Sequence, residues 1–103
     1  MNIVQYLFVC LSEELAEVSQ EIGKCQRFTP HHKPDCYDTT NVERVQLEMA
    51  DVYAISQLLN EQGVFTGIFV PDNLSGAMLA RLVDKKARTV KLMEISRELG
   101  VLE

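Results

Sequence analysis

Few residues in this sequence interrupt regular structure, since only three prolines and five glycines occur among 103 residues. Hydrophobic residues make up 47% of the chain. This composition excludes a disordered or low-complexity protein. Because no linker or internal repeat divides the chain, we expect a single compact domain over residues 1–103.

Basic residues are also scarce, with 10 Lys and Arg against 15 Asp and Glu, which gives a net charge of -5. Proteins that bind polymeric nucleic acid usually present a basic patch and a high isoelectric point. Polymeric nucleic acid is therefore not an expected partner. A small anionic ligand stays compatible with the acidic background if a metal ion or a local group of Lys and Arg offsets the charge.

Long hydrophobic runs are absent, because no stretch approaches the roughly 18 uninterrupted apolar residues of a membrane span. The apolar start, Met1 to Leu11, has no Lys or Arg before it, and Glu13 and Glu14 follow where a cleavage site needs small residues. We therefore expect no membrane segment and no export signal. Three cysteines without a secretory signal favour reduced thiols, so the predicted location is cytoplasmic.

The spacing of apolar residues predicts helices separated by one long loop. Apolar residues recur every three or four positions from Ile3 to about Cys25, which predicts a first helix with Leu15 and Ile22 on its buried face. The first half of this helix is apolar almost all round, so it must be covered on more than one side. Residues 27–39 contain two prolines and few aliphatic residues, which predicts a long loop.

Two further helices complete the predicted fold. Thr40 and Glu43 have the spacing of a capping box and predict a helix from near Asn41 to near Gln62, with Gly63 directly after it. Residues 64–70 predict a short helix or packed connector rather than a strand. A last helix is expected to run to Gly100, capped by Asp72 or Asn73 and bent near Gly76. The predicted fold is all-α, an antiparallel helix bundle completed by self-association into a dimer or tetramer.

Acidic residues occupy positions that the helical pattern otherwise gives to the core. On the first helix, the stripe that contains Leu7 and Leu11 continues one turn later with Glu14 and then Glu17. On the second helix, Glu48 and Asp51 lie three residues apart on the face that continues with apolar residues. Each of the two helices is thus predicted to aim a pair of carboxylates inward.

Four clustered carboxylates repel each other and lose hydration, which is unfavourable unless a positive charge lies among them. A hard divalent cation provides that charge, because Mg²⁺ and Mn²⁺ prefer oxygen ligands and carboxylates at i, i+3 can reach the same ion. The sequence therefore predicts a Mg²⁺ site, with Mn²⁺ possible, formed by Glu14, Glu17, Glu48 and Asp51.

Two other interpretations remain open from the residues alone. The acids at positions 13, 14, 17 and 21 are also typical of a solvated helix face, which would leave a non-catalytic helical interaction protein. The loop residues Cys25, His31, His32 and Cys36 could hold Zn²⁺, although their spacing matches no common zinc finger. The second acid pair argues against a solvated face. Glu48 and Asp51 lie in a segment, Val45 to Leu59, that has almost no other charged residue and is therefore expected to be mostly buried.

The two acidic motifs together resemble those of a known enzyme family. Glu13-Glu14-Leu15-Ala16-Glu17 followed by Glu48-Met49-Ala50-Asp51 is similar to the Glu-Glu-x-x-Glu and Glu-x-x-Asp pair of the MazG-like, all-α nucleotide pyrophosphohydrolases. The stretches at residues 24–28 and 40–44 also look like phage-type and bacterial members. If the chain is encoded by a phage, the predicted cytoplasmic location is the cytoplasm of the host cell.

This resemblance implies Mg²⁺-dependent hydrolysis of a nucleoside triphosphate, with a deoxynucleotide as the expected substrate, to the monophosphate and pyrophosphate. The family's ligands carry over to the same four acids, Glu14, Glu17, Glu48 and Asp51, and leave the role of Glu13 and the identity of the general base open. A triphosphate also needs cations and a contact for its base or sugar. The candidates for substrate binding are Lys24, Arg27, Tyr53, Lys85, Lys86 and Arg88, with Lys91 close to the last group.

Overall fold

The chain folds into three α-helices in a computed structural model that describes residues 1–67 and 70–103. They are α1 (Ile3–Phe28), α2 (Asn41–Glu61) and α3 (Gly76–Glu98). The described residues contain no strand, so the prediction of an all-α protein is confirmed. Of the expected connector at 64–70, residues 64–67 and 70 form neither helix nor strand, and residues 68–69 lie outside the described part.

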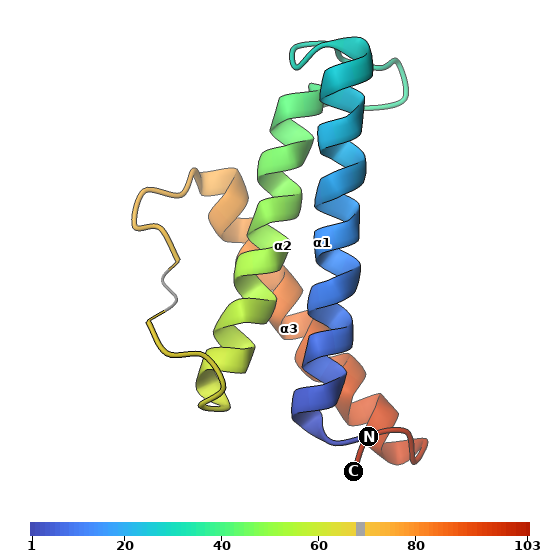
Figure 1. The fold of residues 1–103 in the computed structure, drawn as a ribbon, viewed down its shortest axis with the longest axis vertical. Coiled ribbons are helices and arrows are strands. Elements are labelled where there is room, and N and C mark those ends of the chain that lie inside the picture. The colour runs from blue at the N-terminus through green and yellow to red at the C-terminus, as the bar shows by residue number, and fades with distance from the viewer. Residues whose placement is uncertain (68–69) are drawn as a thin grey trace.

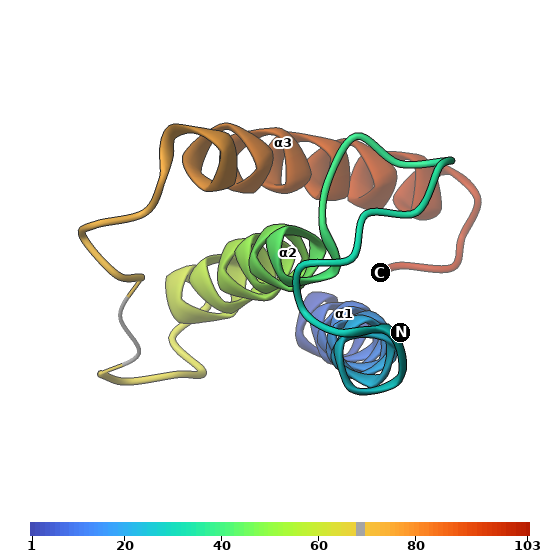
Figure 2. The same cartoon turned by 90° about the horizontal axis from the view of Figure 1, so that it is seen from above.

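Helix α2 lies at the centre of the arrangement and packs against both other helices. Figure 1 shows α1 and α2 side by side and antiparallel, with α3 crossing them obliquely. The view from above in Figure 2 places α3 on one side of the α1–α2 pair. The chain ends meet, because the amino group of Met1 donates to the carbonyl of Val101 at 2.7 Å.

Side-chain caps fix where each of the three described helices begins. Thr40 and Glu43 form the predicted capping box: Glu43 N–H donates to Thr40 Oγ1 and Thr40 N–H donates to Glu43 Oε1, both at 3.2 Å. Helix α2 ends before Gly63, which has a φ of 73° that favours glycine. The predicted caps of α3 are wrong. Ser75 is the N-cap and accepts the Met78 N–H at 3.2 Å, so α3 begins at Gly76 and no bend occurs there.

The connection between α1 and α2 is shorter than predicted and is tied to both helices. Helix α1 continues to Phe28. The buried side chain of Asn41 donates to the carbonyl of Thr29 at 3.0 Å, and its backbone N–H donates to the carbonyl of His32 at 2.9 Å. These bonds hold the loop over the ends of α1 and α2.

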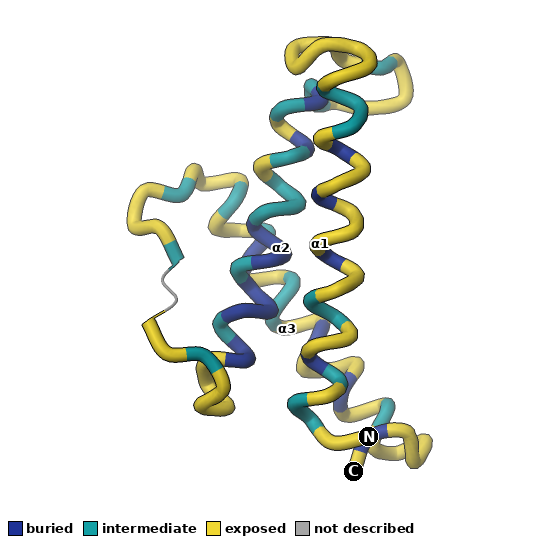
Figure 3. The backbone as a smooth tube through the Cα atoms, in the orientation of Figure 1, coloured by how far each residue is buried: buried dark blue, intermediate teal, exposed yellow. Residues whose placement is uncertain are grey.

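The core contains two groups of apolar side chains, one at each end of α3. The larger group consists of Leu7, Ile55, Leu58, Leu59, Met93 and Leu102. The smaller group consists of Ala50, Ala54 and Leu82. The buried positions gather along α2, whereas most of α1 is exposed, as Figure 3 shows.

The buried face of α1 differs from the predicted one. Leu15 and Ile22 are 50% and 45% exposed, and the residues buried in this part of α1 are Glu14, Val18 and Glu21. Glu14 and Val18 lie on the predicted face, whereas Glu21 is buried in place of Ile22. Glu14 and Glu21 are buried because they find partners on α3 and α2. No helix in the described part of the chain combines the length and the apolar character that crossing a membrane requires.

Candidate metal centre

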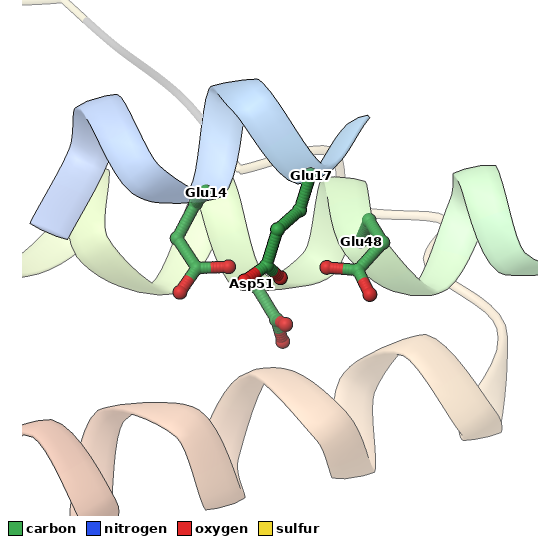
Figure 4. A group of neighbouring side chains, drawn as sticks. All are labelled: Glu14, Glu17, Glu48 and Asp51. Atoms are coloured by element: carbon green, nitrogen blue, oxygen red, sulfur yellow. The ribbon is translucent and has the colours of Figure 1, made fainter. Parts of the chain in front are cut away.

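Four acidic side chains from α1 and α2 meet at the centre of the molecule. Glu14 and Glu17 come from α1, and Glu48 and Asp51 come from α2, each pair at i, i+3 spacing. One carboxylate oxygen of each lies within 4.8 Å of the others. Figure 4 shows the four carboxylates converging in the space beside α3. The structure thus brings together all four residues that the sequence predicts as metal ligands.

Two oxygens of this cluster are buried without a hydrogen-bond partner. Glu14 and Asp51 are only 4% and 3% exposed. Glu14 Oε2 and Glu48 Oε2 are both buried and accept no hydrogen bond. Buried polar atoms are almost always paired, so two unpartnered carboxyl oxygens in one cluster indicate a place for a cation. Oxygen ligands alone are the donor set of Mg²⁺ or Mn²⁺.

Helix α3 contributes two cations that contact the cluster. Lys85 Nζ lies 2.5 Å from Glu14 Oε1. Arg81 binds Asp51 with two nitrogens, Nε to Oδ1 at 3.0 Å and Nη2 to Oδ2 at 2.9 Å, and Nη2 also donates to Glu48 Oε1 at 3.1 Å. The cluster therefore contains four acids and two bases, and it stays anionic overall.

Arg81 is absent from the residues that the sequence predicts for the site. It precedes Lys85 by four residues and Arg88 by seven, so the three positions share one face of α3. This spacing is the sequence signal that points to Arg81. The signal is weak because Lys85, Lys86, Arg88 and Lys91 form a denser group of basic residues nearby.

Burial and crowding change the acidity of the cluster. Burial, together with a hydrogen bond to Glu17, raises the pKa of Glu48 from 4.5 to about 7, and Arg81 opposes the shift only partly. Burial also raises the pKa of Glu14, against the effect of Lys85. Burial lowers the pKa of Lys85, but the contact with Glu14 and the nearby Asp51 outweigh it, so the net shift is upward. The metal-free site therefore retains a proton on Glu48 near neutral pH.

This proton predicts opposite pH trends with and without metal. The folded metal-free protein binds a proton at Glu48 that the unfolded chain releases above pH 4.5, so its free energy of unfolding should fall as the pH rises toward 7. A divalent ion requires ionised ligands, so the increase in Tm caused by Mg²⁺ should be larger at about pH 8 than at about pH 6. Thermal melts with Mg²⁺ and with a chelator measure both trends. A Tm that does not respond to Mg²⁺ at either pH would favour a merely solubilising acidic face.

Most of the other predicted binding residues lie outside the cluster. Lys24 Nζ bonds Glu21 at 3.0 Å, Lys86 Nζ bonds Glu61 at 2.8 Å, and Arg88 Nε bonds Asp84 at 2.8 Å. Tyr53 packs against the smaller core group. Among the predicted substrate-binding residues, Lys85 is therefore the one with an ion pair to the cluster, through Glu14.

Lys24 and Arg27 instead face a small cavity of about 240 Å³ beside the loop. Its other walls are Phe28, His32, Pro34, Tyr37 and Asn41. The lining is aromatic with two flanking cations, which suits a planar group better than a phosphate chain.

The cysteines and histidines of the loop do not gather around a common point. Among the described residues, the four acids are the one group of His, Cys, Asp or Glu side chains close enough to hold a metal ion. His31, His32 and Cys36 are exposed, and Cys25 is half-buried on α1. The geometry gives no support to a zinc site in the loop.

The chain matches no protein-family model, no curated protein and no solved structure. The likeness to the MazG-like enzymes therefore extends no further than the short motifs that carry it.

Proposed function

We propose that this protein is a divalent-metal-dependent pyrophosphohydrolase that converts nucleoside triphosphates, with deoxynucleotides as the preferred substrates, to monophosphates and pyrophosphate. The observation that carries the proposal is the convergence of two carboxylate pairs from adjacent helices, with buried oxygens that have no partner. Glu14, Glu17, Glu48 and Asp51 would hold Mg²⁺ or Mn²⁺. A solvated acidic face would show neither the burial of Glu14 and Asp51 nor the convergence.

The reaction breaks one bond in the triphosphate. A water oxygen attacks the α-phosphorus, the bond from that phosphorus to the oxygen bridging the α and β positions breaks, and pyrophosphate leaves. The bound cation would neutralise phosphate charge and acidify the attacking water. One of the chain's own carboxylates would accept the proton of this water.

Lys85 is the residue that we propose as a phosphate ligand, and its position supports this role. Its ammonium already lies against Glu14, and its side chain is 23% exposed, so it can reach a phosphate at the edge of the cluster. A lysine acts on phosphate as a point charge, without the fixed geometry of a guanidinium. We also propose that the chain has the MazG-like fold and that the protein acts in the cytoplasm.

The direct test is a panel of ribo- and deoxynucleoside triphosphates assayed with Mg²⁺ and with Mn²⁺. We expect equal amounts of monophosphate and pyrophosphate from at least one nucleotide, and no turnover after chelation. Release of orthophosphate alone, or no turnover of any nucleotide with either metal, would contradict the proposal.

Self-association into a dimer or tetramer is the second part of the proposal. An apolar groove of about 740 Å³ runs between α2 and α3. Leu79 and Val83 on its rim are 52% and 59% exposed, and Phe8 and Val9 on α1 are 43% and 47% exposed. Exposed apolar side chains that line a groove on a small domain are typical of an interface between subunits.

Val83→Glu should therefore convert the oligomer into a monomer at micromolar concentration, because it introduces a charge into the apolar contact. Gln26→Glu, at an exposed position of α1, adds the same charge outside the groove and should leave the assembly intact. Sizing with light scattering compares the two variants. A wild-type protein that is already monomeric would refute self-association.

A further inference from the structure

Arg81 is the residue of the candidate metal centre whose role the proposed function leaves unassigned. It makes three hydrogen bonds of 2.9–3.1 Å to Asp51 and Glu48, and both acids are predicted metal ligands. The two nitrogens on Asp51 form a bidentate pair, the strongest geometry for guanidinium and carboxylate. Arg81 therefore uses oxygens that a metal ion would need.

The surroundings of Arg81 favour a contact that can be exchanged. The Arg81 side chain is 33% exposed, whereas the side chains of Asp51 and Glu48 are 4% and 16% exposed. The guanidinium lies at the solvent edge of the cluster, and the acids lie behind it. It can leave the acids by rotating its flexible side chain into solvent without disturbing the core.

The charges of the cluster point the same way. When fully ionised, the four carboxylates carry four negative charges, of which Arg81 and Lys85 neutralise two. A divalent ion at the oxygens that Arg81 occupies would bring one more positive charge than the guanidinium and would repel it. The released guanidinium would then lie beside any phosphate that binds the metal.

We infer that Arg81 is an exchangeable counter-cation, which holds Asp51 and Glu48 in the metal-free protein and passes to a phosphate of the bound nucleotide when metal takes its place. This inference rests on the proposed function, because it assumes the metal site and an anionic polyphosphate ligand. A guanidinium suits both partners, since carboxylate and phosphate each offer two oxygens in the plane of its fork.

The inference predicts two effects of opposite sign from one substitution. Arg81→Met removes a competing positive charge, so Mn²⁺ should bind the free protein at least about tenfold more tightly. The same variant should bind inorganic tripolyphosphate at least about tenfold more weakly in saturating Mg²⁺, because a bidentate phosphate contact is lost. Paramagnetic resonance of free Mn²⁺ measures the first effect and titration calorimetry measures the second.

Two further variants make the test decisive. Arg97→Met removes the same charge from the last turn of α3 and should change neither affinity more than about twofold, since distant surface charges are screened. Arg81→Gln should also bind Mn²⁺ more tightly and tripolyphosphate more weakly than the wild type. The test therefore does not depend on the folding of a single variant. Unchanged or weaker Mn²⁺ binding by both Arg81 variants would overturn the inference. A wild-type protein that binds no Mn²⁺, with or without tripolyphosphate, would instead contradict the proposed metal site.

Discussion

Replacing Glu48 with glutamine is expected to lower nucleotide turnover at least about a hundredfold, because even residues that only support metal ligands commonly contribute ten- to a hundredfold. Glutamine keeps the volume of the side chain but cannot supply an anionic oxygen to a cation or accept the proton of an attacking water. The loss should appear in kcat, with the overall helix content unchanged. Steady-state release of pyrophosphate measures it.

The same substitution should leave the metal-free protein as stable as the wild type, or more stable. Glu48 has a raised pKa because its ionised form is buried next to other carboxylates, so a neutral amide relieves repulsion above pH 7. Glu94→Gln, at an exposed position of α3, provides a matched loss of charge and should change neither quantity. A Glu48→Gln protein with wild-type turnover, or one that is strongly destabilised without metal, would show that Glu48 is not a metal ligand.

The second large effect is expected at Arg44, which organises the end of the molecule near the loop. Its Nε donates to Glu21 Oε2 at 3.1 Å, Nη1 donates to the carbonyl of Thr39 at 2.7 Å, and Nη2 donates to Asn41 Oδ1. The guanidinium also lies 4.0 Å from the centre of the Tyr37 ring. Arg44 and Glu21 are 8% and 9% exposed, so this ion pair is largely shielded from water.

Arg44→Met should lower the free energy of unfolding by about 3 kcal/mol, since breaking a buried pair leaves an uncompensated charge. Lys24, 3.0 Å from Glu21, keeps the loss at the lower end of the usual range because it still partly compensates the carboxylate. Urea unfolding at fixed protein concentration measures the difference.

The exposed pair of Arg88 and Asp84 provides the control for this experiment. Their side chains are 60% and 64% exposed, so Arg88→Met should change stability by less than about 1 kcal/mol. Equal stability of the Arg44 and Arg88 variants would contradict the structural role given to Arg44.

The helices and the four acids could be predicted from the sequence because local signals determine them. The capping box at Thr40 and Glu43 and the glycine after α2 mark the ends of one helix, and the i, i+3 spacing places each acid pair on one face. The start of α3 was predicted too early because Asp72, Asn73 and Ser75 are all good caps, and local chemistry does not choose among them.

The partners of the buried charges depended on contacts between helices and could not be predicted in the same way. Glu21 belongs by spacing to an ordinary acidic helix face, yet it is buried because Arg44, 23 residues later, reaches it from α2. Arg81 meets Asp51 across 30 residues of chain. How α2 packs against α1 and against α3 determines these contacts, and no periodicity within one helix reports that packing.

Anomalous scattering from a crystal containing Mn²⁺ tests the metal centre most directly. We expect one or more peaks bounded by the carboxylates of Glu14, Glu17, Glu48 and Asp51, with metal–oxygen distances of about 2.1 Å. The absence of a peak at this position at saturating Mn²⁺, with Arg81 still bonded to Asp51, would contradict a metal-dependent function for this site.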